Sequence, residues 1–167
     1  MSRMHADGDP FVPDDVAWIA VSPRLALARR IPSCVFFGFV ALVVVVVALL
    51  TDRERLLLLA LVPVALAAWS WWIIGRQVAA CRYAERADDL LLRRGVLFRS
   101  LVVVPYGRMQ FVDVQAGPLD RALGIARVQL HTASPGTDAS IPGLVPEQAA
   151  QLRETLARRG EARLAGL

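Results

Sequence analysis

Arginine is the residue type in this sequence with the clearest capacity for chemistry. All 19 basic residues are arginine, and the formal net charge is +4. Residues 1–30 hold four Arg and four Asp, whereas residues 75–167 hold 13 Arg and nine acidic residues, so the net charge lies in the C-terminal part. Such an excess favours contact with anionic lipid headgroups or an acidic partner. The candidate binding residues are Arg76, Arg82, Arg93, Arg94, Arg99 and Arg108.

An ordinary solvated surface is the competing interpretation of these arginines. Glu85, Asp88 and Asp89 lie close to them in the sequence and dilute any basic patch. Nucleic-acid binding is not expected, because the sequence has no aromatic RNA-binding motif, zinc-finger spacing or long basic helix. The expected partners are therefore membrane lipids or another protein.

Motifs for catalysis are missing from the sequence. It contains no Gly-x-Ser-x-Gly, no Ser-x-x-Lys and no glycine-rich phosphate loop. The two histidines, His5 and His131, have no metal-ligand spacing with other residues, and Cys34 and Cys81 are expected to be packing residues. We expect no enzyme activity, no cofactor and no metal.

Two long apolar runs must position the arginines. Residues 31–50 and 56–74 carry no charge, and only five residues separate them. Twenty helical residues extend about 30 Å, the thickness of the hydrocarbon core of a bilayer. The first run is too far from the N-terminus and too long for an ordinary signal peptide. The sequence therefore predicts a two-helix transmembrane hairpin over residues 31–77.

The ends of the second run carry further signals. Pro63 should kink this helix, because proline lacks a backbone donor. Trp69, Trp71 and Trp72 are typical of residues at the headgroup layer.

Six arginines flank the outer ends of the two spans and two lie between the spans. This bias predicts a multi-pass protein of the inner or plasma membrane with both termini cytoplasmic.

The N-terminal 30 residues are expected to form no domain of their own. The start is polar and rich in Asp and Pro, and from Val16 onward the pattern turns amphipathic. Trp18, Ile19, Val21 and Leu25 are the apolar residues of this segment. We expect it to lie along the membrane surface and lead into the first span.

After residue 77 the pattern changes to short strands separated by turn residues. Strands are expected at 90–94, 98–104, 109–116 and 126–132, with a helical turn at 118–124 and a loop at 133–139. In 126–132, Val128 and Leu130 share the core face. A closing helix should begin at Pro146 and end at Gly160, and 161–167 should be a tail. Its buried stripe is expected to be Val145, Ala149, Leu152 and Leu156.

Five ordered blocks in this region carry a family resemblance. They are LLRRGV at 91–96, VPYGRMQ at 104–110, GPLDR at 117–121, LGIA at 123–126 and VQLHTA at 128–133. Together with the two spans, the chain resembles the bacterial pleckstrin-homology (PH) domain membrane proteins of the YdbS type. The resemblance implies a membrane α-helical hairpin plus an α+β domain at 78–160, in which a PH-like antiparallel sheet is closed by a C-terminal helix. A first strand at 81–86 is weakly patterned, and the resemblance implies no catalytic residues.

Two functions follow as expectations. The first is a non-enzymatic, membrane-anchored adaptor that docks a membrane protein of the same family, or a second copy of itself, at the cytoplasmic face. The alternative is a sensor of anionic lipid headgroups. Transport is disfavoured, because two uncharged spans cannot line a polar path unless they oligomerise.

Overall fold

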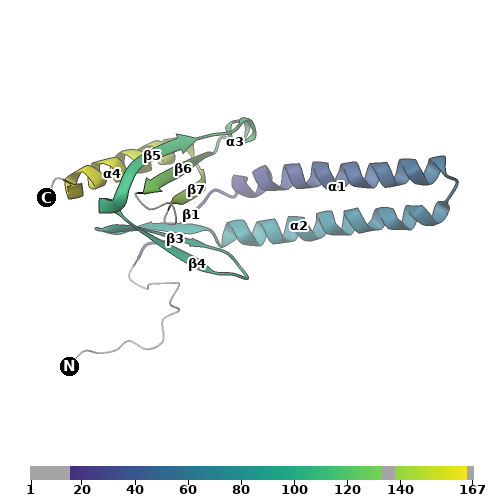
Figure 1. Ribbon diagram of the computed structural model, residues 1–167, viewed down its shortest axis with the longest axis horizontal. Helices are drawn as coiled ribbons and strands as arrows, with labels where there is room; N and C mark the ends of the chain where they lie inside the picture. The colour runs from purple at the N-terminus through teal and green to yellow at the C-terminus, as the bar shows by residue number, and fades with distance from the viewer. Residues whose placement is uncertain (1–15, 133–137, 165–167) are drawn as a thin grey trace, which may run out of the picture.

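A computed structural model describes residues 16–132 and 138–164 of the chain. The polar start through Asp15, most of the loop expected at 133–139 and the last three residues lie outside the described part. Figure 1 shows a long helical hairpin at one end of the molecule and a mixed α/β body at the other.

The helical hairpin consists of α1 (Arg24–Leu50), η1 (Glu54–Ala60) and α2 (Leu61–Ala79). Both arms are long and apolar enough to cross a membrane, and only 6% of the most apolar window in each is buried inside the protein. A core helix of a soluble protein would be mostly buried. The exposed apolar surface of the hairpin is therefore suited to lipid.

The helical hairpin differs from the expectation in two places, which are the start of its first arm and the position of Pro63 in its second arm. The helix α1 starts at Arg24 and continues through Pro32. Pro63 was expected to kink the second helix. It lies instead in the first turn of α2, where a backbone donor is not needed, and does not interrupt an α-helix. The 3₁₀ segment η1 ends just before it. The two arms are joined inside the apolar region by a hydrogen bond of 2.8 Å between the Ser33 and Ser70 hydroxyls.

Within the described residues, seven strands form two antiparallel sheets. The first sheet has the order β1-β2-β3-β4, and its strands are β1 (Ile19–Ala20), β2 (Arg82–Glu85), β3 (Asp89–Arg94) and β4 (Ser100–Pro105). The second has the order β5-β6-β7, with β5 (Met109–Gln115), β6 (Ala126–Thr132) and β7 (Ala139–Leu144). The short helices η2 (Tyr106–Arg108) and α3 (Pro118–Ala122) connect strands, and α4 (Pro146–Leu164) closes the body.

The helical hairpin is inserted between the first two strands of this domain. Ile19 pairs with Tyr83 across β1 and β2, although the whole hairpin separates them in the sequence. Just after β1, the Ser22 amide donates to the Gly143 carbonyl on β7 at 2.8 Å. Residues on both sides of the hairpin therefore build one sheet system, as Figure 1 also shows where α1 and α2 enter the body.

This arrangement corrects the expectation of a surface-lying amphipathic segment at residues 16–30. Val21 and Leu25 are buried in the core of the domain, and Leu25 is only 4% exposed. Val21 and Leu25 join this core because β1 pairs with β2 just before them, whereas Ile19 of β1 stays exposed. The isolated sequence pattern could not distinguish a membrane surface from a protein core.

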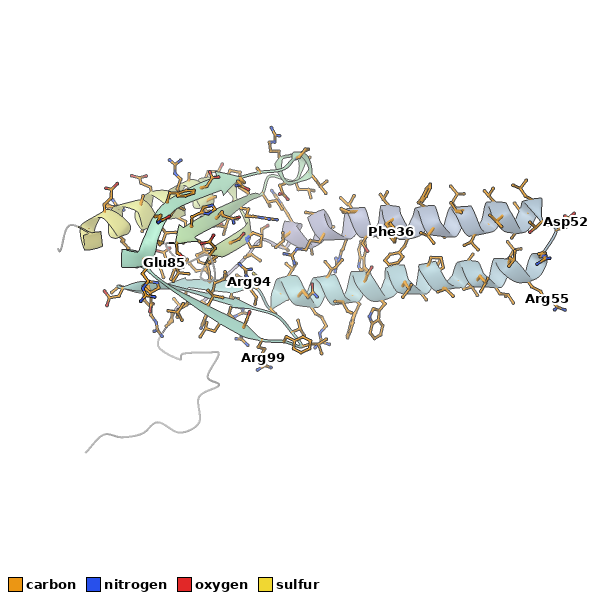
Figure 2. The ribbon with its side chains drawn as sticks, in the orientation of Figure 1. Phe36, Asp52, Arg55, Glu85, Arg94 and Arg99 are labelled. Carbon is orange, nitrogen blue, oxygen red and sulfur yellow. The ribbon has the colours of Figure 1, made fainter. Side chains whose placement is uncertain are left out.

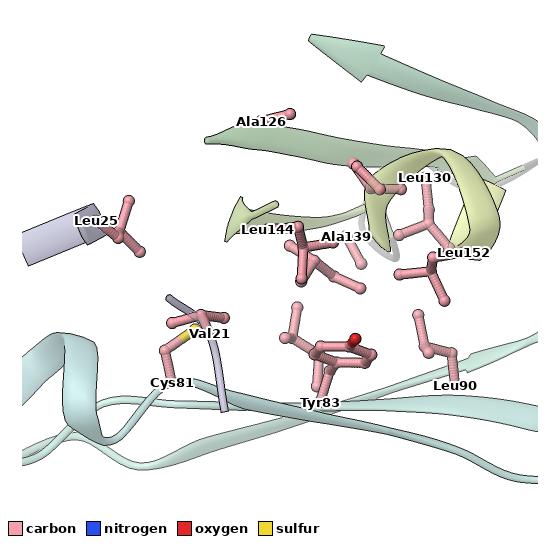
Figure 3. Packing of buried hydrophobic residues seen from close by; sticks show 14 of the residues in the cluster. Val21, Leu25, Cys81, Tyr83, Leu90, Ala126, Leu130, Ala139, Leu144 and Leu152 are labelled. Atoms are coloured by element: carbon pink, nitrogen blue, oxygen red, sulfur yellow. The ribbon is translucent and has the colours of Figure 1, made fainter. Parts of the chain in front are cut away.

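The core lies between the two sheets and under α4 (Figure 3). Leu90 and Leu92 of β3 face Val128 and Leu130 of β6 across it. The strands at 90–94 and 126–132 and the helical turn after Pro118 were predicted correctly, whereas the strand β7 was missed.

The predicted start of the closing helix is confirmed, and its predicted end is wrong. Ala149, Leu152 and Leu156 are buried along one stripe, as expected. The helix does not stop at Gly160 but runs to Leu164. A Cβ at Gly160 would lie 3.7 Å from the Tyr106 carbonyl oxygen, so this glycine lies where α4 passes close to η2 and does not terminate the helix.

Candidate functional site

The six candidate arginines do not form a single cluster. Arg82 and Arg93 are partners across β2 and β3, so they share one face of the first sheet. Arg108 is exposed on η2, where the chain passes from β4 to β5. Arg94 and Arg99 lie at the end of the domain beside the helical hairpin, whereas Glu85 lies at the opposite end (Figure 2).

Two of the six, Arg76 and Arg94, line a pocket of about 950 Å³ where the hairpin meets the domain. Arg29 of α1 and Arg127 of β6 complete its basic lining, which we call the arginine pocket. Four guanidinium groups thus approach one space from four different elements. Its apolar lining includes Trp69, Trp72, Ile73, Val96, Leu97 and Phe98.

Strand geometry explains why Arg94 reaches the pocket and Arg93 does not. Side chains alternate between the faces of a strand, so Arg94 continues the face of the buried Leu90 and Leu92. Arg93 points to the outer face together with Arg82. On β6, the register against β7 shifts between Ala126 and Val128, and a bulge of this kind redirects a side chain. Arg127 lies at that shift.

The electrostatics of the arginine pocket are strongly positive. Burial lowers the pKa of Arg94, and the positive charges of Arg29 and Arg127 lower it further, while Cys81 acts in the opposite direction. Burial likewise raises the pKa of the Cys81 thiol, although Arg94 and Arg29 oppose this shift. Among the residues that the structure describes, no acidic side chain contributes to the pocket lining.

Internal hydrogen bonds satisfy Arg94 only in part. One of its terminal nitrogens donates to the Ser140 carbonyl of β7, whereas its buried Nε has no hydrogen-bond partner within the described part of the chain. No salt bridge joins any of the four pocket arginines to an acidic residue among residues 16–132 and 138–164. An anion in the pocket would satisfy both the unpaired donor and the uncompensated charge.

Arginines and tryptophans contact each other at the end of the hairpin that borders the arginine pocket. The Arg30 guanidinium lies 4.4 Å from the centre of the Trp71 ring, and its Nε donates to the Trp71 carbonyl at 3.3 Å. Arg76 lies 4.8 Å from the centre of the Trp72 ring. Trp69 and Trp72 pack against each other with ring centres 5.9 Å apart. The domain-side ends of α1 and α2 are thereby tied together beside the pocket.

The turn between β3 and β4 forms an apolar tip beside these tryptophans. Leu97 is 86% exposed and Phe98 is 91% exposed. Gly95 makes the tight turn possible, because its φ is +90° and a Cβ there would overlap the Phe98 carbonyl oxygen. This tip and the second helical arm therefore both contribute apolar side chains to the arginine pocket.

Sequence reasoning missed part of this site. Arg29 and Arg127 were not among the six candidate binding residues, yet both line the arginine pocket. The apolar triplet after Gly95 was an available signal, because a solvent-facing turn is usually polar. Among the described residues, no group of three His, Cys, Asp or Glu side chains could hold a metal ion.

Comparison with known proteins gives two matches. A family model described as the bacterial PH domain matches residues 26–160, which include the helical hairpin and nearly the whole domain. The transmembrane protein YdbS of Bacillus subtilis (strain 168) is 35% identical over 77 residues, which are 46% of this chain and 47% of that protein. The match thus spans about half the length of this curated relative. No solved structure matches the chain.

Proposed function

Because the chain belongs to the bacterial PH domain family, as a YdbS-like membrane protein, we propose that its domain binds anionic lipid headgroups in the leaflet beside it. The family consists of PH domain membrane proteins and is not a known enzyme family. The proposed role is therefore that of a non-enzymatic, membrane-anchored binding protein.

The arginine pocket is the observation that carries this proposal. It opens where the tryptophan-bearing end of α2 meets the domain, which is the level of the headgroup layer for an amphipathic tryptophan. Its four arginines form no salt bridge within residues 16–132 and 138–164, and each arginine near an anionic surface is worth about 1 kcal/mol. An anionic headgroup fits both the charge and the position.

The arginine bias across the hairpin supports a cytoplasmic location for this domain. Arg24, Arg29 and Arg30 precede the first span, and Arg76, Arg82 and Arg86 follow the second, against Arg53 and Arg55 between them. The pairing of β1 with β2 supports the same topology, because both strands must lie on one side of the membrane. We propose two spans in the inner or plasma membrane, with both termini in the cytoplasm.

A lipid titration of the full chain tests the function. The full chain is needed, because β1 and Leu25 precede the hairpin and a fragment starting after α2 would lack part of its core. Native mass spectrometry of the protein in mixed micelles should detect bound phosphatidylglycerol and little bound phosphatidylcholine. Raising the salt concentration should weaken this binding.

Two charge-matched variants locate the binding. Arg29→Gln with Arg127→Gln removes two exposed pocket charges and should weaken phosphatidylglycerol binding by up to about 30-fold, at about 1 kcal/mol per arginine. Arg108→Gln with Arg153→Gln makes the same change in charge outside the pocket and should have little effect. Equal binding of both lipids, or equal losses in both variants, would refute the proposal.

Protein docking is a second candidate, favoured by the open outer edges of the sheets. Within the described residues, β4 pairs only with β3, and β5 pairs only with β6. Val103 on β4 is 43% exposed, and Phe111 on β5 is 55% exposed and stacks on His131. Such edges can pair with a strand of a second chain. A stoichiometric membrane-protein partner, lost on changing Phe111→Glu but not in the arginine variants, would favour this adaptor role.

A further inference from the structure

The charge of the arginine pocket exceeds what one ordinary phospholipid can neutralise. Within the described part of the chain, its lining contains four arginines and no acidic residue. A guanidinium keeps its charge under all physiological conditions. A phosphodiester headgroup with a single negative charge would leave most of this positive charge uncompensated, whereas a terminal phosphate group carries a charge of about −1.5 to −2 at pH 7.

The number of arginines at the pocket also favours a terminal phosphate. Arg29, Arg76, Arg94 and Arg127 belong to α1, α2, β3 and β6, so four separate elements supply the basic lining. Guanidinium groups bind phosphate through paired hydrogen bonds. A terminal phosphate offers three free oxygens, whereas a phosphodiester offers two and carries a further substituent on the side facing the arginines.

The apolar lining indicates that this phosphate belongs to a lipid. Trp69, Trp72 and Ile73 line the pocket from α2, and Leu97 and Phe98 line it from the β3–β4 turn. Inorganic phosphate or pyrophosphate would make no use of these side chains. A lipid held by its headgroup would lay the first part of its hydrocarbon chain against them.

We propose that the arginine pocket binds a lipid whose headgroup ends in a phosphate or diphosphate and carries about two or more negative charges. This inference rests on the proposed binding of anionic lipid and adds the chemical class of the headgroup. The phosphate end contacts the four arginines, and the hydrocarbon end leaves between α2 and the β3–β4 turn.

A comparison of two lipids with identical acyl chains tests the charge class. The full chain in mixed micelles is titrated with phosphatidic acid, a phosphomonoester, and with phosphatidylglycerol, a phosphodiester, and native mass spectrometry measures both affinities. At pH 8 phosphatidic acid should bind on the order of tenfold more tightly. Near pH 5 the advantage should shrink, because the second pKa of a phosphomonoester is about 6.

The variants and a soluble competitor complete the test. Arg29→Gln with Arg127→Gln should reduce the preference for phosphatidic acid, whereas Arg108→Gln with Arg153→Gln should leave it unchanged. Equal, arginine-dependent affinities for the two lipids at pH 8 would overturn the inference and leave the proposed function standing. Absence of binding to either lipid would overturn both. Displacement of phosphatidic acid by equimolar inorganic pyrophosphate would show that the ligand is not a lipid.

Discussion

Replacing Gly143 by alanine should destabilise the domain through the contact that joins α1 to β7. Gly143 has a φ of +74°, and a Cβ there would lie 2.7 Å from the Leu25 Cβ. The left-handed conformation costs a residue with a Cβ about 1–2 kcal/mol. Overpacking a core typically costs about 1–3 kcal/mol more. The free energy of unfolding should therefore fall by about 2–5 kcal/mol, a large part of the stability of a small domain.

The thiol of Cys81 is a convenient reporter of this loss. It is buried in the domain core, and burial also raises its pKa, so the folded protein should react slowly with a maleimide. With the exposed Cys34 changed to alanine, the urea concentration at which Cys81 becomes reactive measures unfolding of the domain in a nanodisc. Gly143→Ala should lower that concentration.

A double-mutant cycle separates the clash from general damage to the domain. Leu25→Ala alone should cost about 2–5 kcal/mol, because it leaves a cavity. Combined with Gly143→Ala, it removes the clash, so the double variant should lose less than the sum of the single losses by about 1 kcal/mol or more. Gly160→Ala, inside α4, serves as the control. The added Cβ would make only ordinary van der Waals contacts, so this substitution should be neutral or stabilising. Additive losses at Leu25 and Gly143 would refute the packing of α1 on β7.

Three further outcomes are expected. In a chain whose native cysteines are replaced by alanine, Thr51→Cys should react with an impermeant maleimide in intact cells and Gln151→Cys should not; the opposite result would reverse the proposed topology. Leu152→Asp should remove the protease resistance of the domain, because burying an unpaired carboxylate costs several kcal/mol, and wild-type resistance would contradict the packing of α4. A fluorophore on Phe98→Cys should be quenched by lipids with spin-labelled chains more strongly than one on Val103→Cys, and equal quenching would place the β3–β4 turn outside the bilayer.

The local patterns of the sequence predicted the elements well and their long-range pairing poorly. The two spans, the strand at 126–132 and the start of α4 at Pro146 follow from apolar periodicity and from turn or cap residues, which are local signals. The strand β1 has two residues, and β7 contains Pro142 and Gly143. Neither shows the alternation typical of a strand, and β1 has its partner β2 on the far side of the helical hairpin.

The sequence predicted the positive charge of the candidate site but not which arginines line it. Excess arginine and the tryptophans of the second span pointed to the end of the molecule where the arginine pocket lies. Arg127 joins the pocket through a register shift in β6, and Arg29 joins it because α1 begins inside the domain core. Both depend on tertiary contacts. Arg82, Arg93 and Arg108 carry the same charge, but the fold directs them elsewhere.

The insertion of the helical hairpin between β1 and β2 sets an order of events during synthesis. In a soluble chain, closing a loop of this length before β1 could pair with β2 would carry an entropic cost. We expect both arms to enter the bilayer as they leave the ribosome, and their packed ends then to bring Val21, Leu25 and Cys81 into one core. The membrane thus acts as a template that closes the loop, and completion of the sheets should wait for insertion. A chain that fails to insert would leave Val21 and Leu25 without their native partners and would expose the unfinished core to quality-control proteases.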